Sequence, residues 1–353
     1  MDKSGIRDVA KRAGVSIATV SHVLNNTRFV TEDTRHKVLE AIEALDYHPN
    51  AIARSLKTRR YNLIAFVVPD IANAFFATLI EEVENIIAEK GYRLIVVNTK
   101  ETQAREIENL RALANGIVDG FIIASTLPSY ADIEKVVPPD VPKVFIDRIL
   151  PRCPCDTITV TNYEAMFKGV SHLIRMGHRN IGYITGIPRI STTSERLKAY
   201  RAAMEASHLP TEGLIRIGDS MSTCVSTNLD ALLEAHCTAL VVSNNVMATE
   251  AMLQLLDRGL RASKDIDLLG YKDSEQAQYG LQHMHLIVQP TIDLARAAGR
   301  QIIERIESPD LPVRQTVIQA VFSPRNADRT GLSCRLNDSG STVAKPAKQT
   351  AGR

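Results

Sequence analysis

The segment GVSIATVSHVLNN, residues 14–26, decides the fold of the first part of the chain. Gly14 and Val15 interrupt an apolar stripe, and Ser16 is a residue type that caps helices, so a new helix is expected to start there. The inward face of this helix is apolar and consists of Val20, Val23 and Leu24. Its outward face is small and mixed, with Ile17, Ala18, Ser21 and His22. Such a face is expected to meet something other than water.

Two further helices are expected beside this segment. IRDVAKRA (residues 6–13) precedes it with one apolar stripe, and TEDTRHKVLEAIEALDY (residues 31–47) follows with acidic residues in its first turn, where the helix dipole favours them. Helix, tight glycine turn and helix form the helix-turn-helix layout, whose second helix enters the major groove of DNA. There His22 can donate to guanine, while Thr19 and Ser21 can reach phosphates.

The charge is distributed unevenly along the chain. Residues 1–60 contain 11 Lys or Arg against 7 Asp or Glu, and residues 325–353 contain 6 against 2, while the whole chain carries only +2. The middle is therefore acidic. A basic head suits a phosphate backbone, whereas an acidic body does not bind nucleic acid over its whole surface. The polar stretch 326–353 lacks periodicity, and we expect it to be disordered.

Composition excludes several classes of protein. With 353 residues, 44% of them hydrophobic, the chain can form more than one folding unit. No apolar run approaches the roughly 18 residues that span a bilayer, and none follows the basic start, so we expect a cytoplasmic protein without a membrane partner. The cysteines have no zinc-like spacing, which predicts free thiols and no metal site. They are Cys153, Cys155, Cys224, Cys237 and Cys334.

From Tyr61 onwards, short apolar strands alternate with amphipathic helices. One series contains NLIAFVVPD, YRLIVVNTK, GFIIAS and VPKVFID, and a second contains NIGYITG, GLIRIG, TALVVSN and IDLLGY. Near-continuous apolar strands separated by helices predict parallel sheets covered on both faces. The two series predict an α/β body of two similar lobes. Its ligand is expected at the carboxyl ends of the strands.

The sequence IRDVAKRAGVSIATVSHVLNNTRFVTEDTRHKVLEAIEALDYHPNAIARSLKTRR resembles the DNA-binding head of the lactose-repressor (LacI/GalR) family of bacterial transcriptional regulators. Within that family the head is closest to the purine-repressor and ribose-repressor type. The resemblance continues through VVPDIANAFFATLI, GYRLIVVNT, GHRNIGYITG and IVQP. It implies a small all-α head joined by a hinge helix to a two-lobed body like periplasmic binding proteins, with doubly wound parallel sheets.

The resemblance also implies domain boundaries. Residues 1–48 would form the helix-turn-helix head, 49–60 the hinge, and 61–325 the effector-binding and dimerisation body, followed by the tail 326–353. Within the body, lobe 1 would comprise about 61–161 plus 292–323, and lobe 2 about 162–291. The hinge is too short to be helical alone, so DNA and a second copy would order it. No leucine heptad follows the body, which favours a homodimer on a pseudo-palindromic operator.

Residues at matching positions would contact the double-stranded operator. Ile17, Ala18 and His22 would be base readers. ARSLK would be the hinge helix in the minor groove, with Leu56 wedged into the central base step and Lys57 beside it. The remaining expected DNA contacts come from Thr19, Ser21, Asn25, Tyr47 and Arg54.

The same comparison implies an effector site between the lobes. Its predicted residues are Asn73, Phe75, Phe76, Asp147, Arg148, Thr192, Arg196, Asn244, Lys272 and Asp273. Phenylalanine rings would cover an apolar face of the ligand, while acidic and amide side chains satisfy its hydroxyls. The guanidinium of Arg196 would grip an acidic group in a bidentate manner.

Four departures from the family pattern guide the prediction of the effector. Ala74, Ala199, Asn245 and Lys272 stand where the family usually has Pro, Gly, Asp and an acidic residue. The acid lost at Asn245 and the cation gained at Lys272 make the cleft less negative than is usual in the family. We therefore predict that the effector is a sugar acid or sugar phosphate and that the regulated genes form a carbohydrate catabolic operon. RISTTSERL (residues 189–197) also resembles regulators of hexuronate and ketodeoxygluconate breakdown. If Lys272 faces solvent, the alternative is a neutral sugar, nucleobase or nucleoside.

The sequence does not fit two other classes of protein. An enzyme would need a catalytic motif, yet the chain has no G-x-G-x-x-G after a strand, no P-loop, no nucleophile elbow and no H-E-x-x-H. A secreted solute-binding protein would share the body but carry a signal segment and no helix-turn-helix. The sequence therefore predicts a non-enzymatic regulator that needs no cofactor.

Overall fold

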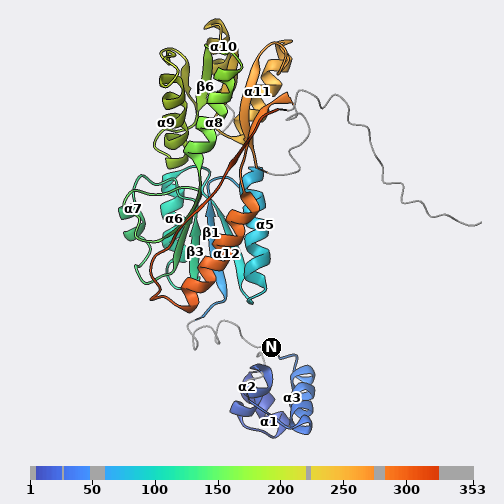
Figure 1. Ribbon diagram of the computed structural model, residues 1–353. Helices are drawn as coiled ribbons and strands as arrows, with labels where there is room; N and C mark the ends of the chain where they lie inside the picture. The colour runs from blue at the N-terminus through green and yellow to red at the C-terminus, as the bar shows by residue number, and fades with distance from the viewer. Residues whose placement is uncertain (1–4, 26–27, 48–59, 220–223, 274–282, 326–353) are drawn as a thin grey trace, which may run out of the picture.

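The computed structural model describes residues 5–25, 28–47, 60–219, 224–273 and 283–325. Figure 1 shows a small helical head and a body of two α/β lobes, which confirms the predicted fold class. Apart from Arg60, the predicted hinge 49–60 lies outside the described residues, and with it Arg54, Leu56 and Lys57. The expected disordered tail 326–353 lies outside them as well.

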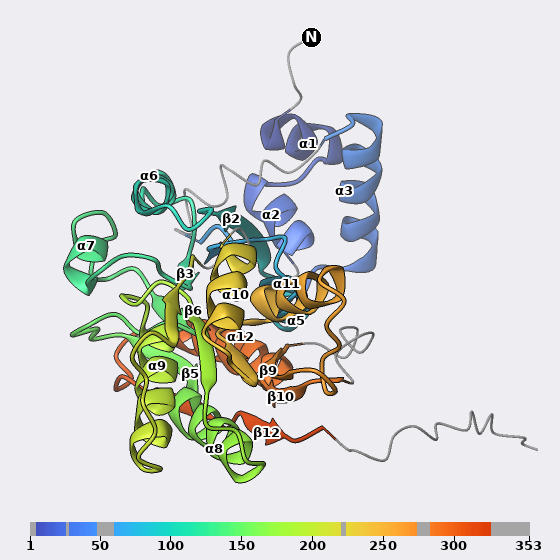
Figure 2. The same ribbon diagram turned by 90° about the horizontal axis from the view of Figure 1, so that it is seen from above.

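Three helices form the head: α1 (Ile6–Ala13), α2 (Ile17–Asn25) and α3 (Glu32–Ala44), seen from above in Figure 2. Gly14 ends α1 with a φ of 65°, a left-handed conformation that favours glycine. Oγ of Ser16 then accepts a hydrogen bond from the N–H of Thr19 (3.0 Å), which caps α2 as predicted. One fully buried valine from each helix meets in the core, namely Val9, Val20 and Val38.

Lobe 1 contains a parallel six-stranded sheet in the order β11-β5-β4-β3-β1-β2. Its strands are β1 (Leu63–Val68), β2 (Arg93–Asn98), β3 (Gly120–Ile123), β4 (Lys143–Ile146), β5 (Asp156–Val160) and β11 (Gln315–Ile318). One face is covered by α5 (Ala74–Ala88) and α12 (Thr291–Glu307), the other by α6 (Gln103–Leu113) and α7 (Tyr130–Glu134). Because both faces are buried, β1 is apolar throughout.

Lobe 2 repeats this plan with a sheet in the order β12-β10-β9-β8-β6-β7. Its strands are β6 (Ile181–Thr185), β7 (Ile215–Ile217), β8 (Ala239–Val242), β9 (Asp267–Lys272), β10 (His285–Val288) and β12 (Val321–Ser323). Helices α8 (Asn162–Arg175) and α9 (Ser191–Glu205) cover one face, and α10 (Val225–Glu234) and α11 (Asn245–Asp257) the other. All neighbouring strands are parallel except β12, which runs antiparallel to β10.

The chain passes between the lobes three times, after β5, after β10 and after β11. This corrects one expected boundary, since residues 292–323 were assigned to lobe 1. The last of them, β12, belongs to lobe 2, where Val321 and Ser323 pair with Val288 and Leu286 of β10. The physical reason is that β10 would otherwise be an open sheet edge, whose unpaired backbone groups β12 satisfies.

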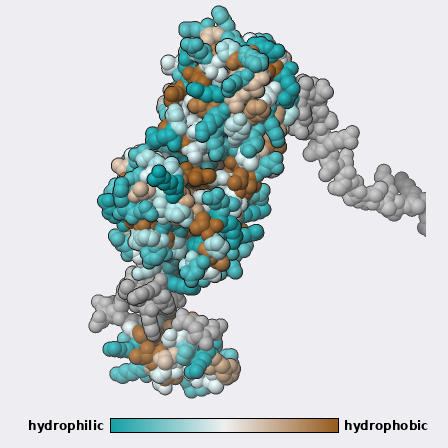
Figure 3. All heavy atoms as spheres, turned by 60° about the vertical axis from the view of Figure 1, so that its left-hand side comes forward, coloured by the Kyte–Doolittle hydropathy of each residue, from teal (hydrophilic) through white to brown (hydrophobic). Residues whose placement is uncertain are grey.

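On the face shown in Figure 3, hydrophilic residues cover most of both lobes, with apolar residues scattered among them. Across the described ranges, no helix combines the length and apolar character needed to cross a bilayer. The same ranges contain no group of three His, Cys, Asp or Glu side chains placed to hold a metal ion.

Candidate functional site

The outer face of α2 carries the residues predicted to contact bases. The Ile17 side chain is 45% exposed and Ala18 is exposed, whereas Val20 and Val23 lie in the core of the head. The other three residues of the predicted set are half-buried: Thr19, Ser21 and His22. The face is thus small enough for its backbone to approach base edges. The base contacts themselves stay predictions.

The remaining predicted DNA contacts have different surroundings. Tyr47 follows α3 and is half-buried against the apolar core of the head, so its ring contributes to the packing of the head. Asn25 is the last residue of α2. Arg54, Leu56 and Lys57 are outside the described part of the chain, and their roles stay predictions.

A cavity lies between the lobes, where the carboxyl ends of strands from both sheets meet. It leaves about 60 Å³ of room for the centres of water-sized spheres. Nine of the ten predicted effector residues line it: Asn73, Phe75, Phe76, Asp147, Arg148, Thr192, Arg196, Asn244 and Asp273.

Eight further lining residues were not predicted: Asp70, Glu101, Gly186, Ile190, Thr193, Ser243, Asn245 and Gln289. Gly186, Ser243 and Gln289 each follow directly after a strand. The general rule that ligands of open α/β sheets bind at the carboxyl ends of strands would have found these three. The sequence did not indicate that Glu101 lines the cavity, because its position there depends on its ion pair with Arg148.

The start of α5 forms an apolar wall of the cavity. Asn73 caps the helix, with Oδ1 accepting a hydrogen bond from the N–H of Phe75 (3.0 Å). The rings of Phe75 and Phe76 meet edge to face, with centroids 5.1 Å apart, and both side chains are buried. This pair can cover a flat or apolar ligand face, and that role stays a prediction.

Two charged residues follow β4, and one of them is already paired. Arg148 donates bidentately to the carboxylate of Glu101, with distances of 3.0 and 2.7 Å. The neighbouring Asp147 is buried with a φ of 66°, and this burial raises the pKa of its carboxyl group. Arg148 is therefore neutralised within lobe 1, so the cavity gains little net positive charge from it.

Arg196 of α9 lies at the centre of the cavity wall in lobe 2. Its guanidinium donates to Oδ1 of Asn162 (2.8 Å), to the carbonyl oxygen of Ser243 (2.6 Å) and to Oε1 of Gln289 (3.3 Å). It also lies over the ring of Tyr271, 4.0 Å from the centroid. Three of its five N–H groups are thus engaged, and the rigid fork can offer the others to a ligand.

Lys272 does not line this cavity, which corrects the prediction for that residue. It lines a second cavity, together with Glu81 and Glu82 of α5 and Asp293 of α12. Side chains alternate along a strand, and Tyr271 contacts Arg196, so Lys272 at the end of β9 points to the opposite face of the sheet. The extra cation that favoured an anionic effector is therefore absent from the cleft.

Asp273 follows Lys272, and its side chain lines the cleft between the lobes. Its side chain is buried, and Oδ1 accepts a hydrogen bond from Nε2 of Gln289 (2.6 Å). The other oxygen, Oδ2, has no hydrogen-bond partner in the described part of the chain. Burial raises the pKa of this carboxyl group to about 6. Asp273 is thus placed to accept a hydrogen bond from a ligand.

The raised pKa of Asp273 predicts a pH-dependent stability. Because the folded carboxyl group keeps its proton up to about pH 6, the folded state binds more protons than the unfolded state between about pH 4 and 6. The free energy of unfolding should fall by up to about 3 kcal/mol across this window. Asp273→Asn should lose that slope in urea unfolding from pH 4 to 7, whereas Asp70→Asn at the cavity mouth should keep it. A parent-like slope in Asp273→Asn would contradict the assignment.

Two hydrogen bonds join the lobes beside the cavity. Nδ2 of Asn245 donates to Oδ1 of Asn73 (2.8 Å), and the N–H of Ile149 donates to Oγ of Ser191 (2.9 Å). The usual aspartate at position 245 could not donate the first of these when ionised. The departure from the family pattern therefore supplies an interlobe contact.

The charge of the cavity lining is dominated by acids. Carboxyl groups come from Asp70, Glu101, Asp147 and Asp273, against the two guanidinium groups of Arg148 and Arg196. One guanidinium is paired with Glu101 and lies near Asp147, and the other is shared among three protein acceptors. A ligand that brings hydrogen-bond donors fits such a lining better than one that brings negative charge.

A helix-turn-helix head followed by a two-lobed ligand-binding body defines a ligand-responsive DNA-binding regulator. Residues 5–50 match the family model of bacterial regulatory proteins of the lacI family. Residues 62–327 match the model of periplasmic binding proteins and the sugar binding domain of the LacI family. The chain belongs to the LacI family.

Curated relatives and solved structures agree with this assignment. The transcriptional repressor PurR of Aliivibrio salmonicida is 36% identical over 86% of this chain and 92% of its own length. The transcriptional regulator DegA of Bacillus subtilis is 30% identical over 84% and 91%. The lac repressor dimer bound to operator and the anti-inducer ONPF has a TM-score of 0.80 at 23% identity, covering 92% of this chain and 98% of that one. The CelR–cellobiose complex has a TM-score of 0.68 at 26% identity, covering 91% and 99%.

These relatives are transcriptional regulators, which confirms the prediction of a DNA-binding regulator rather than an enzyme. Binding of operator DNA and of a small-molecule effector follows at the level of the family. The class of the effector is a separate question, which depends on the cavity described above.

Proposed function

We propose that the chain is a cytoplasmic repressor that binds a pseudo-palindromic operator as a homodimer and responds to a neutral small molecule in the cleft. The ligand carries several N–H or O–H donors, as a nucleobase, a nucleoside or a neutral sugar does. The single observation that carries this proposal is that, at the end of β9, an acidic residue rather than a basic one lines the cleft. Lys272 lines another cavity, while Asp273 lines the cleft and, within the described residues, its Oδ2 has no hydrogen-bond partner.

The expected sugar acid or sugar phosphate loses its main support with Lys272. An anion would have to share Arg196 with three protein acceptors while lying close to buried Asp147 and Asp273. A neutral ligand meets no such repulsion, and its donors can satisfy the two carboxylates. The relatives named PurR add a likeness to the purine-repressor type that the head also shows, which favours a nucleobase or nucleoside over a sugar.

Matched pairs of ligands test the charge of the effector directly. The full-length protein would be screened by thermal shift with adenosine and AMP, ribose and ribose 5-phosphate, and glucose and gluconate, together with free purine bases. A bound ligand raises the apparent stability by mass action. We expect any stabilising ligand to be the neutral member of its pair, with binding checked by calorimetry. A charged member that binds more tightly than its neutral partner would overturn the proposed effector class.

The homodimer accounts for an exposed apolar surface on α11. The side chains of Leu253 and Leu256 on this helix are 50% and 65% exposed. Exposed leucines in close succession suit a protein interface better than contact with water. A dimer would also bring two heads to one DNA duplex, which is the arrangement that a pseudo-palindromic operator requires.

Readout by His22 gives a test of the DNA-binding half. His22→Ala should weaken operator binding by about 1–3 kcal/mol, with the loss concentrated at one base pair per half-site. Affinity for random duplex DNA should stay nearly constant, because phosphate contacts dominate there. Electrophoretic shifts with operator variants and random DNA at fixed salt would measure both. Equal losses on the two kinds of DNA would show that His22 contacts only the backbone.

A further inference from the structure

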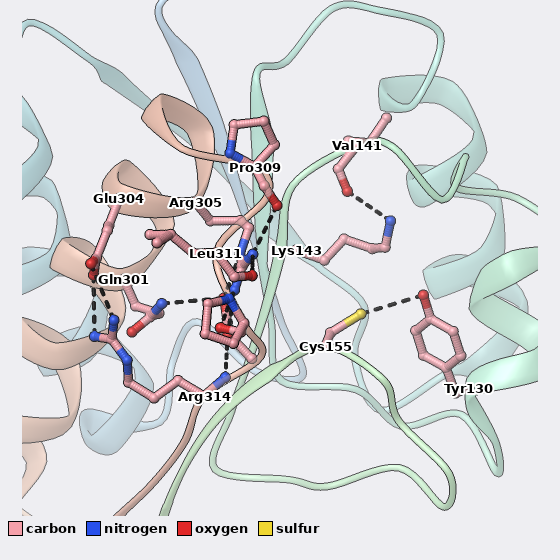
Figure 4. Close-up of polar contacts among 12 residues, drawn as sticks. Tyr130, Val141, Lys143, Cys155, Gln301, Glu304, Arg305, Pro309, Leu311 and Arg314 are labelled. Carbon is pink, nitrogen blue, oxygen red and sulfur yellow. Dashed lines mark hydrogen bonds and ion pairs between the residues drawn. The ribbon is translucent and has the colours of Figure 1, made fainter.

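A pair of cysteines lies at the opposite edge of the lobe 1 sheet from the effector cleft. Cys153 and Cys155 flank Pro154 immediately before β5, so they lie at the amino ends of the parallel strands. Figure 4 shows the sulfur of Cys155 pointing toward the hydroxyl of Tyr130, the first residue of α7, with Lys143, the first residue of β4, beside them. Sγ of Cys155 and Oη of Tyr130 are 3.3 Å apart.

The surroundings of the two thiols differ in a way that separates their reactivity. A hydrogen bond from the Cys153 thiol, supported by the Tyr130 hydroxyl and the positive charge of Lys143, lowers the pKa of Cys155 to about 7. The same contact between the sulfurs raises the pKa of Cys153. Lys143 is held in place because its ammonium group donates to the carbonyl oxygens of Val141 (2.7 Å) and Pro138 (2.8 Å). Cys155 is thus the more easily ionised thiol of the two.

The pair is accessible, unlike another cysteine of the body. Both side chains are half-buried, and Cys155 lines an open cavity with Lys143 and Arg305. Cys237 is buried, and this burial raises its pKa to about 11. Burial also raises the pKa of Cys224. Small, water-soluble oxidants are therefore expected to reach and attack Cys155 before either of these thiols.

We propose that Cys155 is a peroxide-sensitive thiol and that Cys153 resolves its oxidised form into a disulfide. The Cys155 thiolate attacks one oxygen of hydrogen peroxide, so that an S–O bond forms, the O–O bond breaks and hydroxide leaves as water after taking up a proton. The Cys153 sulfur then attacks Cys155, the S–S bond forms, and the S–O bond breaks to release a second water. The two thiols lose two electrons, which the peroxide gains.

The local chain geometry is compatible with this second step. Cys153 and Cys155 are only two positions apart in the chain. A reducing cytoplasm keeps such a pair as thiols, so a peroxide pulse would convert it and thiol reductants would restore it.

Mass spectrometry of the full-length protein tests the proposal. After hydrogen peroxide treatment, the peptide that contains both cysteines should lose about 2 Da, which a thiol reductant reverses. Cys153→Ser should instead accumulate a sulfenic acid at Cys155 that dimedone traps, at least about ten-fold faster than Cys224 or Cys237 is modified. Cys155→Ser should leave Cys153 unmodified over the same time.

Two further measurements separate a tuned thiolate from mere exposure. In Cys153→Ser, the rate of dimedone-trapped oxidation should rise with pH around a single midpoint, since the thiolate is the attacking species. Adding Tyr130→Phe should slow the reaction at neutral pH and move the midpoint upward. The proposal is overturned if the parent shows no reversible mass loss at this peptide, or if Cys224 and Cys237 react as fast as Cys155.

Discussion

Replacing Arg196 with methionine is expected to abolish the response of operator binding to the effector. The guanidinium joins Asn162, Ser243 and Gln289 around the cavity, so its removal leaves three buried acceptors without a donor. The lost charge-assisted contacts should lower ligand affinity by about a hundred-fold or more. Calorimetry with the neutral ligand found by the matched-pair screen, and electrophoretic shifts with operator, measure the two effects.

Two variants control this experiment. Arg201→Met removes an exposed arginine from the same helix α9 and should leave ligand affinity unchanged. Arg196→Lys keeps the positive charge but loses the planar fork, so it should recover only part of the affinity. If Arg196→Met bound the ligand as tightly as the parent while its fold stayed intact, Arg196 would be excluded as an effector contact.

Replacing Asp156 with alanine should cause the largest loss of stability. This carboxylate accepts hydrogen bonds from Arg305 (2.9 and 3.0 Å), from Gln301 (3.2 Å) and from the backbone N–H of Arg314 (2.8 Å). The side chain of Asp156 is fully buried, so its removal leaves a largely buried guanidinium without its counter-charge. Breaking such a pair costs about 3–5 kcal/mol. Urea unfolding of parent and variant measures the difference.

A neighbouring ion pair supplies the matched control. Glu304 and Arg314 also form a bidentate pair, with both distances 3.1 Å, and Figure 4 shows it beside the Asp156 partners. Their side chains are 42% and 50% exposed, so Glu304→Ala should cost less than about 1 kcal/mol. Similar losses in Glu304→Ala and Asp156→Ala would show that burial does not decide the strength of these pairs.

The strands and helices that the sequence predicts are those with a regular apolar pattern. The strands containing Ile64, Ile122 and Val241 were found because burial on both faces makes every residue apolar. Strand β5 was missed because it reads DTITV, and Asp156 is there to bind Arg305. The edge strands β11 and β12 were missed because half of their residues face water, which dilutes the apolar pattern.

The sequence predicted which positions form the effector site better than it predicted where their side chains point. Matching residues located most of the cavity lining, including Arg196 and Asp273. The prediction for Lys272 was wrong because the expected strand ended at Tyr271, whereas β9 continues to Lys272. Side chains alternate along a strand, so Lys272 faces the side of the sheet opposite to Tyr271. The partners of Arg148 and Arg196 could not be predicted either, since Glu101, Asn162 and Gln289 come from distant parts of the chain.

The three passages of the chain between the lobes set the order in which the protein can be completed during synthesis. Lobe 1 begins with β1, yet α12 and β11, which cover and extend its sheet, are made only after all of lobe 2 except β12. The first half to leave the ribosome therefore waits with one sheet face only partly covered, by α5 alone, until residue 318 has emerged. A chain that stops at Val160 would lack these elements, so neither half can be produced as a folded fragment by a single cut.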